Sequence, residues 1–525
     1  MGAFREAYEK INAILKGKGG MDRPLNSEVI SSIESEDSAF IYLLKAPTGY
    51  GKTSVSWALA LGATKYSAIF NNVIHVLPLR SIIEDIQRRS KNYFWENFSA
   101  VKMMGVSEEI FHLYPFNITT VDTFIWDTIK LNTKKIRRIK ERKEFGYDLL
   151  TQATILNSLV FFDEAHYIIE DEMMRGAFGV VLNFLFSLRV PIIVSSATMP
   201  KNHQEVFEWF AKRYGYTFKT FEPAPSDPYI EKERRKKLTV SLERIKPFES
   251  KGIVPKLEPS RNLIVLNSVK KAVSVYESLG ERCAGDKLLL HGKMKPSHRI
   301  KVLEKLNQLQ NKTFTLVCTQ VVEAGVDLSS DNLITELAPP NQLIQRMGRV
   351  ARREEDSARI TIIDTGDSAP YSQSVIEGSL RWLEVNANAL HPRLPESYQV
   401  FLDTVYKGTY EIKSSLDRHK NLLNLLLDLR TRSNEILQRV EEIAKSEGFL
   451  REFSLPVSID DEIVLFSPRE VEKLYEDGKI EVRGCYEEQK PNFYELAKSL
   501  AFGRKSVELT YTWDYDEERG VVVWE

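Results

Sequence analysis

Short, uninterrupted apolar runs alternate with helical patterns in the first half of the chain. The runs occupy residues 40–44, 73–77, 159–162 and 192–194, and each is followed by polar or glycine-rich residues and then by a helical stretch. Continuous apolar runs of this kind are typical of parallel strands that are covered on both faces. The pattern therefore predicts an α/β domain over residues 36–219, preceded by an N-terminal segment over 1–35.

The same design is repeated in a second block of the chain. Here the apolar runs occupy residues 263–266, 288–290, 316–318 and 360–363. They predict a second α/β domain over 259–385. Between the two blocks lies a stretch with clustered prolines and dense charge, which favours a linker over 220–258. The predicted fold class is α/β, with two parallel-sheet domains in tandem.

The pattern changes after residue 385. Residues 416–444 carry apolar positions at helical spacing with charges on the other face, which favours a pair of core-packing helices. The last residues form two β-rich runs around an acidic turn that contains Gly520. We therefore expect a smaller accessory region over 386–525, helical at first and then β-rich.

Composition narrows the class of protein. The 525 residues include 72 Lys+Arg against 73 Asp+Glu, a net charge of −1 that excludes a histone-like binder but permits a basic channel on a neutral body. The three cysteines lie far apart, which argues against a disulfide scaffold or a structural zinc site. The longest uncharged apolar stretch, residues 176–188, is too short to cross a bilayer, and the N-terminus lacks a signal-peptide core. We expect a cytoplasmic protein without membrane contact.

A phosphate-binding loop is predicted directly after the first apolar run. Close approach to a triphosphate needs small residues, a helix N-terminus, a lysine for the β- and γ-phosphates and a hydroxyl for Mg²⁺. The eight residues that supply these features are Ala46, Pro47, Thr48, Gly49, Tyr50, Gly51, Lys52 and Thr53. An accidental match is the alternative, and the strand–loop–helix context argues against it. The predicted cofactors are ATP and Mg²⁺.

An acidic box follows the apolar run that ends at Phe162. A carboxylate at this point can hold the Mg²⁺ of a phosphate loop, a role that suits Asp163, while Glu164 suits a general base that orients water. A solvated acidic turn is the alternative, but it leaves the preceding buried strand without a purpose. Ser196 and Thr198 follow another apolar run. Isolated Ser/Thr turns are common, so only this position after a predicted strand makes the two residues candidates for the site.

The second block ends in a cluster of arginines. Hydrolysis of ATP between two domains requires cations that reach the γ-phosphate when the domains close. Arg349 and Arg352 are three residues apart, which predicts two guanidinium groups on one face of a helix. A surface charge cluster is the alternative for this segment taken alone.

Taken in order, the segments APTGYGKT, DEAH, SSAT, TQVVEAGVD and QRMGRVARR resemble the motifs of superfamily 2 DEAH-type helicases. The flanking segments ITTVDTF, LNSV and LLHGKM are similar to those of the CRISPR-associated helicase of type I interference systems. The resemblance covers residues 20–370 and implies two tandem RecA-like domains.

The resemblance also implies roles for individual residues. It gives the nucleotide phosphates and Mg²⁺ to Lys52, Thr53 and Asp163, and the attacking water to Glu164. Ser196 and Thr198 would couple hydrolysis to movement. The second domain would contribute Gly325, Asp327, Gln345, Arg349 and Arg352. The family's adenine-sensing glutamine has only Asn26 as a match, so adenine specificity stays open.

Nucleic-acid contacts are expected on both domains. The resemblance points to Arg80, Thr120 and Thr319. Separately, residues 130–143 carry a single acidic residue among many lysines and arginines, of which Lys134, Lys135, Arg137 and Arg138 are the candidates for phosphate contacts. A solvated basic helix and a docking edge for an effector complex are the alternatives.

The implied function is that of an ATP-dependent single-stranded DNA translocase and helicase in CRISPR interference, acting with a CRISPR RNA-guided effector complex. None of the eight histidines is followed by aspartate, and only about 45 residues precede the phosphate loop, so we expect the HD nuclease to be a separate subunit. A cellular DEAH-type RNA or DNA-repair helicase is the alternative. A third candidate is an assembly factor that uses nucleotide only as a clamp.

Overall fold

The computed structural model divides the chain into two compact units, each built from two separate segments. The first consists of Met1–Glu233 and Lys407–Glu452, and the second of Arg234–Tyr406 and Phe453–Glu525. The residues described are 2–523 apart from 18–19, 66–68, 79, 104–105, 108–110, 132–135, 142, 144–146, 171, 247, 281–282, 284, 324–325, 408–419, 429, 447–453, 485–490 and 502–506. Within these residues, no helix is both long enough and apolar enough for a bilayer crossing.

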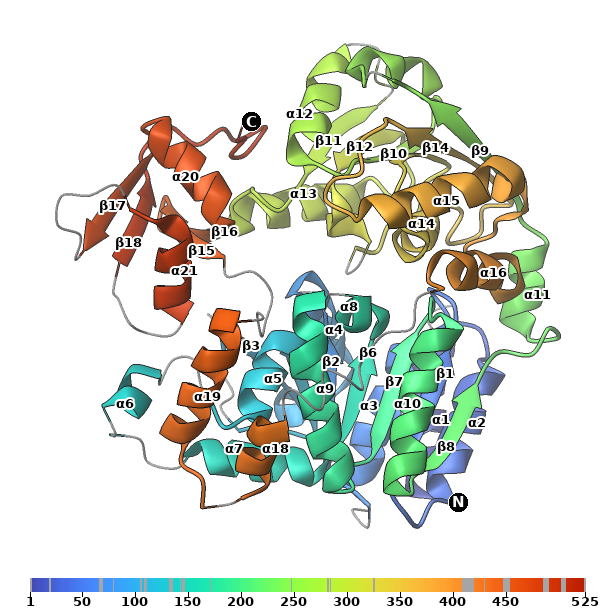
Figure 1. Cartoon of the computed structure of the whole chain (residues 1–525). Coiled ribbons are helices and arrows are strands. Elements are labelled where there is room, and N and C mark those ends of the chain that lie inside the picture. Colours follow the sequence, from blue (N-terminus) through green and yellow to red (C-terminus); the bar gives the residue numbers. More distant parts are fainter. Residues whose placement is uncertain are drawn as a thin grey trace. The chain divides into compact units, whose positions relative to one another are not determined.

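The first unit is built on an eight-stranded sheet with the order β4-β3-β5-β2-β6-β7-β1-β8 (Figure 1). Its pairs are parallel except β3 with β4. All four predicted runs form central strands, namely β1 (Phe40–Lys45), β2 (Asn72–Leu77), β6 (Ser158–Asp163) and β7 (Ile192–Ser196). The remaining strands are β3 (Ser99–Met103), β4 (Val106–Ser107), β5 (Phe116–Thr120) and β8 (Thr217–Phe221). The predicted α/β class is therefore confirmed for this unit.

Helices cover both faces of this sheet, as parallel strands require. They are α1 (Ala3–Lys16), α2 (Pro24–Glu34), α3 (Lys52–Ala63), α4 (Arg80–Tyr93), α5 (Val121–Thr128), α6 (Ile136–Lys140), α7 (Tyr147–Leu156), α8 (His166–Glu170), α9 (Glu172–Ser187), α10 (Lys201–Tyr214) and α11 (Pro228–Arg234). Helices α1 and α2 pack on α3, so the N-terminal segment is part of the fold rather than a separate piece.

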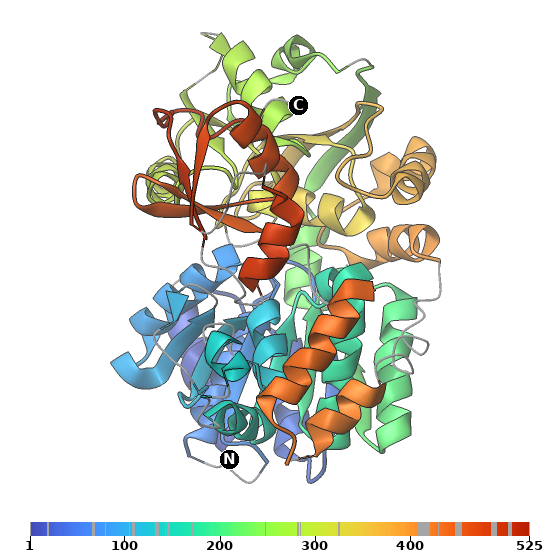
Figure 2. The same ribbon diagram turned by 60° about the vertical axis from the view of Figure 1, so that its left-hand side comes forward.

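Two helices from the last quarter of the chain complete the first unit. Helix α18 (Lys420–Leu427) packs against α9, and α19 (Ser433–Ser446) packs against α6 (Figure 2). Their apolar faces are buried, and Lys140 Nζ lies 2.9 Å from Glu441 Oε1. The expectation of one accessory region over 386–525 is corrected here, because residues 407–452 pack with the first unit and the rest packs with the second.

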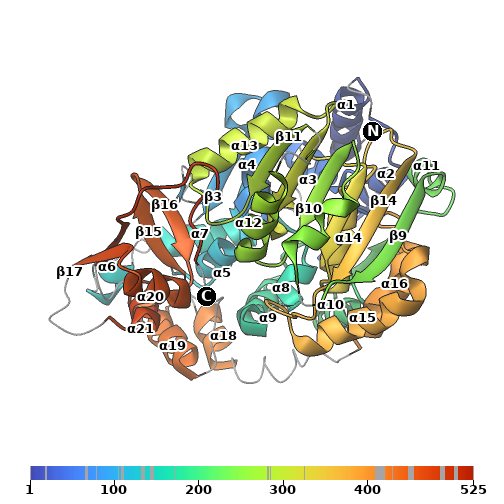
Figure 3. The same ribbon diagram turned by 90° about the horizontal axis from the view of Figure 1, so that it is seen from above.

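The second unit is built on a six-stranded, all-parallel sheet with the order β11-β12-β10-β13-β14-β9 (Figure 3). The predicted runs form β10 (Arg261–Val265), β11 (Asp286–Leu290), β12 (Phe314–Cys318) and β14 (Ser357–Asp364). Two further strands, β9 (Lys237–Arg244) and β13 (Asn332–Glu336), are added to them. The predicted linker over 220–258 therefore needs correction, because β9 is an edge strand whose charged, half-exposed residues conceal its strand pattern.

The helices of this second α/β domain are α12 (Val269–Ser278), α13 (Pro296–Gln308), α14 (Pro340–Met347), α15 (Gln373–Asn386) and α16 (Pro395–Val405). Short 3₁₀ turns lie at Ser250–Gly252, Val254–Lys256, Gln320–Val322 and Ala387–Ala389. The sheet is packed on both faces by apolar clusters. The motif residues of this domain lie in the segment after β12, in α14 and in the loop that follows α14.

A small C-terminal module packs on the second α/β domain within the same unit. Its sheet has the order β16-β15-β18-β17, and its elements are β15 (Leu455–Ile459), β16 (Glu462–Phe466), α20 (Pro468–Glu476), β17 (Ile480–Gly484), α21 (Phe493–Ala501) and β18 (Val507–Tyr511). It has its own apolar core. The first of the two β-rich runs predicted at the C-terminus is β18, whereas residues 521–523 form no strand and instead bring Val521 N to Lys293 O at 3.1 Å.

Candidate functional site

The motif residues of the first unit meet at the carboxyl edge of its sheet. Strand β7 lies between β6 and β1, and its register pairs Ser195 with Asp163 on one side and Ser196 with Lys45 on the other. Three segments that are far apart in sequence therefore end side by side. This edge is where parallel α/β sheets bind ligands.

The loop after β1 has the backbone shape of a phosphate cradle. Gly49 and Gly51 have φ of 84° and 94°, a left-handed conformation that glycine adopts without a steric penalty. Helix α3 begins at Lys52 directly after the loop, so its N-terminal N–H groups are available to an anion. Lys52 Nζ donates to Ala46 O at 3.0 Å and lies 3.3 Å from Glu164 Oε1.

Residues outside the motif brace this loop. Asn26 Nδ2 donates to Gly51 O and to Ser54 Oγ, both at 3.2 Å, so the amide that matches the position of the family's adenine-sensing glutamine is hydrogen-bonded to the end of the loop and the start of α3. Tyr229 OH donates to Thr48 O at 2.8 Å, and Arg23 Nε donates to Tyr50 O at 2.7 Å. Sequence reasoning missed Arg23 and Tyr229, because no local pattern marks contacts between distant segments.

The two carboxylates of the acidic box differ in their electrostatics. Burial favours a raised pKa for Asp163, but His75, whose Nε2 lies 3.5 Å away, and Lys52 outweigh it and lower the pKa to about 2. Burial raises the pKa of Glu164, and the charge of Lys52 offsets part of that effect. Glu164 also has a φ of 48°, which is unusual for a residue other than glycine. Asp163 is therefore held as an anion suited to a cation.

The acidic box is tied to the segment after β7 by hydrogen bonds. His166 Nδ1 lies 2.8 Å from Ser196 Oγ, and Thr198 N donates to Ser196 Oγ at 3.1 Å. Ala165 N donates to Ser195 O at 3.2 Å. Burial lowers the pKa of His166 well below its usual value, so its ring is neutral. Glu164 Oε2 lies 3.5 Å from His166 Nδ1, so the His166 side chain contacts both Glu164 and Ser196.

The residues at this edge fit a triphosphate with Mg²⁺. Thr48 Oγ1 and Thr198 Oγ1 are buried without a hydrogen-bond partner among the described residues, which leaves polar atoms available for a ligand in two of the converging loops. The donor set consists of a lysine, a hydroxyl and a carboxylate, which are the groups that phosphates and Mg²⁺ prefer. Lys52, Thr53 and Asp163 are the residues that would hold them.

Arg349 and Arg352 do not lie on a helix, which corrects the expectation that a helix presents both guanidinium groups on one face. Helix α14 ends at Met347, Gly348 follows as its cap, and Ala351 has a φ of 43°. Arg349 donates to the carbonyls of Val322, Glu323 and Val326 at 2.8, 2.7 and 2.9 Å. Arg352 Nη1 lies 3.2 Å from Asp327 Oδ1.

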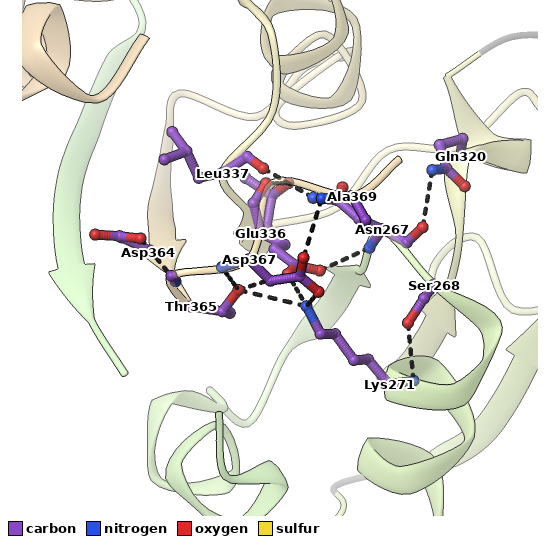
Figure 4. A network of polar contacts seen from close by, with 12 residues as sticks. Asn267, Ser268, Lys271, Gln320, Glu336, Leu337, Asp364, Thr365, Asp367 and Ala369 are labelled. Carbon is purple, nitrogen blue, oxygen red and sulfur yellow. Dashed lines mark hydrogen bonds and ion pairs between the residues drawn. The ribbon is translucent and has the colours of Figure 1, made fainter. Parts of the chain in front are cut away.

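A buried polar network surrounds Asn267 and Glu336 in the same unit (Figure 4). Arg346, which sequence reasoning passed over, is fully buried and donates to Glu323 Oε1 at 2.8 Å and to Asn267 Oδ1 at 3.0 Å. Asn267 N donates to Glu336 Oε2 at 2.8 Å, and Gln320 Nε2 donates to Asn267 O at 3.0 Å. Lys271 pairs with the same buried Glu336. The network fixes the loop after β12 relative to α14.

The structure describes most, but not all, of the remaining residues predicted to contact nucleic acid or to complete the nucleotide site. Thr120 is buried and accepts from Thr123 N at 3.3 Å, which caps α5, and Thr319 and Gln345 are also buried. Arg80 is the first residue of α4, and Arg137 and Arg138 lie in α6. Three predicted residues, Lys134, Lys135 and Gly325, lie outside the described residues.

Two family models match the chain. The DEAD/DEAH box helicase model covers residues 23–206, and the model of the C-terminal part of the CRISPR-associated nuclease/helicase Cas3 covers residues 258–355. Together they take in the phosphate loop, the acidic box and the arginine segment. They confirm the resemblance inferred from the motifs.

Curated relatives point the same way. A putative CRISPR-associated nuclease/helicase Cas3 of Methanocaldococcus jannaschii is 25% identical over 407 residues, covering 70% of this chain and 52% of that protein. A CRISPR-associated helicase Cas3 of Thermoproteus tenax is 27% identical over 369 residues, covering 66% of this chain and 60% of that protein. The chain therefore spans little more than half the length of these relatives.

Solved structures share the fold. The crystal structure of T. fusca Cas3 matches with a TM-score of 0.61 at 17% identity, over 97% of this chain and 65% of that one. The helicase MrfA bound to DNA matches with a TM-score of 0.58 at 14% identity, over 96% of this chain and 73% of that one. These likenesses confirm the predicted arrangement of two tandem RecA-like domains.

Proposed function

We propose that this chain is an ATP-dependent single-stranded DNA translocase and helicase that unwinds target DNA in CRISPR interference. The observation that carries the proposal is the convergence of Lys52, Asp163 and Glu164 at one sheet edge, in a chain similar to Cas3 helicases. A nucleotide-dependent clamp would not need Glu164 next to the phosphate lysine.

The chemistry assigned to the first unit follows from its side chains. Lys52 leaves Ala46 O and Glu164 to bind the β- and γ-phosphates, while Thr53 and Asp163 hold the cation. Bound Mg²⁺ supplies positive charge that offsets the charge developing on the phosphates. Glu164, once released by Lys52, orients water and accepts its proton. Glu164 Oε2 lies 3.5 Å from His166 Nδ1, and His166 in turn contacts Ser196, so this chain of contacts couples the event at Glu164 to Thr198.

The second unit supplies cations for the same reaction. We propose that Arg352, whose guanidinium is partly exposed beside Asp327, binds the γ-phosphate. Arg349 is the second such cation, and it must first give up its hydrogen bonds to backbone carbonyls. Gly325 and Asp327 are proposed to sense the nucleotide, and Gln345 to complete the site with the two arginines. Such arginines are worth on the order of 10³–10⁵ in rate.

Single-stranded DNA is the proposed substrate, and its phosphates are held by Arg80, Thr120 and Thr319 and by four cations of the basic stretch, Lys134, Lys135, Arg137 and Arg138. A structural relative was solved in a CRISPR RNA-guided surveillance complex in a pre-nicking state, with a TM-score of 0.57. It supports an effector complex as the proposed partner. DNA cleavage is assigned to a separate HD nuclease, because no histidine of this sequence precedes an aspartate.

The proposal is tested by ATP hydrolysis and strand displacement with single-stranded DNA and single-stranded RNA of equal length. We expect stimulation by DNA, ATP-dependent displacement, and no hydrolysis by Lys52→Ala, which loses the charge that binds the phosphates. Stimulation by RNA alone would favour the cellular RNA helicase. Wild-type hydrolysis in a folded Lys52→Ala variant would overturn the site.

A further inference from the structure

The segment that carries Arg352 is not held by regular secondary structure. We define residues 348–353 as the arginine loop. It follows the end of α14 and contains Ala351 in a left-handed conformation with a φ of 43°. The last carbonyls of a helix have no partner within the helix, so other groups must satisfy the carbonyls of this loop. A left-handed alanine persists only when its surroundings enforce it.

Two cations from outside the helicase motifs bind the carbonyls of the arginine loop. Lys236 Nζ donates to Ala351 O at 2.6 Å and to Arg353 O at 2.8 Å. Arg393 Nη2 donates to Ala351 O at 2.9 Å, and its Nη1 donates to Gly348 O at 3.3 Å. Ala351 O, the carbonyl of the left-handed residue, therefore accepts hydrogen bonds from two positive charges.

The backbone N–H groups of the arginine loop donate hydrogen bonds to a different set of residues. Arg352 N donates to Ser329 Oγ at 2.9 Å, and Arg353 N donates to Glu355 Oε2 at 2.7 Å. Ala351 N donates to Ser330 O at 2.9 Å. Both the N–H and the C=O groups around Arg352 are thus anchored within the second unit.

The two cations are placed where a charge is costly. Arg393 has none of its surface exposed and Lys236 only 8%. Burying a charged side chain is unfavourable unless strong hydrogen bonds compensate, and bonds from ionised donors are stronger than neutral ones. Lys236 falls in the stretch expected to be a linker, and Arg393 falls in the expected accessory region. Neither lies in the segments matched by family models, 23–206 and 258–355.

We propose that Lys236 and Arg393 are positioning residues that hold the arginine loop in the conformation from which Arg352 serves ATP hydrolysis. This inference rests on the proposed function, because it assigns Arg352 to the γ-phosphate. The two cations hydrogen-bond to the backbone on either side of Arg352, within the second unit. They therefore affect turnover and not the affinity for nucleotide.

The first test compares Lys236→Met with Lys236→Arg, which keeps a donor, and with Arg393→Lys. We expect kcat of DNA-stimulated hydrolysis to fall at least about tenfold in Lys236→Met, because small displacements of a catalytic group have effects of up to about 10²-fold. The dissociation constant for ATP should stay at the wild-type value. Lys236→Arg should recover most of the rate. An unchanged kcat in both Lys236→Met and Arg393→Lys would overturn the proposal.

A double variant separates positioning from general destabilisation. In single-turnover measurements, Lys236→Met should cause no further loss in an Arg352→Ala background, because the residue that it positions is already absent. Lys256→Met is the matched control, since this lysine pairs with Glu243 in the same unit and is not hydrogen-bonded to the arginine loop. Equal losses in the presence and absence of Arg352, or an equal loss in Lys256→Met, would assign Lys236 to stability alone.

Amide hydrogen exchange tests whether Lys236 holds the arginine loop without relying on an activity assay. Amide exchange at Ala351, Arg352 and Arg353 should rise at least tenfold in Lys236→Met and stay unchanged in Lys256→Met. If the wild-type chain hydrolyses no ATP, the proposed function fails and the positioning role fails with it. The exchange measurement then still shows whether Lys236 holds the arginine loop in place. Unchanged exchange at these three amides would overturn the proposal even in an active enzyme.

Discussion

Glu164 combines three features that are uncommon in one residue. Its side chain is only 14% exposed, it is the only residue of the acidic box with a left-handed backbone among those described, and its carboxylate lies 3.3 Å from the lysine of the phosphate loop. Backbone strain of this kind costs on the order of 1–3 kcal/mol and is found where function requires a fixed geometry. Its position is therefore set by the site and not by local sequence preference.

Glu164→Gln should keep ATP binding and stop turnover. The amide has the shape of the carboxyl group but cannot accept a proton from water, a loss worth roughly 10²–10⁴-fold. Nucleotide affinity and steady-state hydrolysis, measured on the same preparation, check this expectation. Loss of binding would instead show that Glu164 holds the phosphate loop together through Lys52.

At the residue scale, contiguous motifs were predictable and contacts between distant segments were not. The structure brings Lys52, Asp163 and Ser196 to one edge because Asp163 and Ser196 end buried strands and Lys52 begins the helix after the loop that follows β1. Arg23 and Arg346 escaped notice because their partners lie far along the chain. The predicted helix under Arg349 and Arg352 was wrong because α14 ends just before Gly348, a residue with a low helix propensity.

At the scale of elements, continuous apolar runs identified eight strands of the two large sheets. The strands that escaped prediction are those with polar or charged positions, such as β5, β8 and β9. In β9 a lysine, two threonine or serine residues and a glutamate alternate with apolar residues, and only Val240 is fully buried. An edge strand needs little apolar surface, so its sequence resembles a linker.

The C-terminal module is attached through a histidine that must be neutral. His291 Nε2 donates to Arg519 O at 2.7 Å, and its Nδ1 accepts from Lys293 N at 3.2 Å. Burial lowers the pKa of His291 to about 4, and the neighbouring Lys293 and Arg299 act in the same direction. Protonation of Nδ1 would remove an acceptor and place a second cation beside Lys293.

Acidification should therefore weaken this attachment. Because the folded pKa is lower than the unfolded value of 6.5, the contribution of His291 is complete above pH 6.5 and is lost progressively as the pH falls toward 4. The loss is about 1 kcal/mol at pH 5.5. Hydrogen exchange at Val521 N, whose partner is Lys293 O, should rise over this range after correction for intrinsic rates. The pH dependence should be smaller in His291→Gln, and an identical dependence would contradict the assignment.

At the scale of the whole molecule, the basic stretch 130–143 is either a surface that binds DNA or a surface that docks a protein partner, and substitutions distinguish the two. Neutralising Lys134, Lys135, Arg137 and Arg138 should weaken DNA binding irrespective of sequence. The slope of log affinity against log salt should flatten by about 0.7 for each lost contact with single-stranded phosphate. Lys140→Gln is the control, because Lys140 is paired with Glu441. Unchanged affinity and slope would indicate a solvated helix, whereas a loss confined to recruitment by the effector complex would indicate docking.

The purified chain should unwind DNA without cutting it. The proposed function assigns cleavage to a separate HD nuclease. Incubation of labelled single-stranded DNA with Mg²⁺, Mn²⁺ or Ni²⁺ should leave it intact until an HD nuclease is added. Nicking that persists in Lys52→Ala would reveal a nuclease site in this chain.

Neither unit of this protein is one continuous piece of sequence. The chain passes between the units three times, after Glu233, after Tyr406 and after Glu452. A single proteolytic nick between residues 406 and 420 would therefore leave two fragments that each contribute to both units, held by the packing of α18 and α19 on α9 and α6. Fragments 1–406 and 407–525 produced together should reassemble, whereas a chain shortened to residue 385 would lose buried surface in both halves at once. Dissection of this protein into independent domains must respect that interleaving.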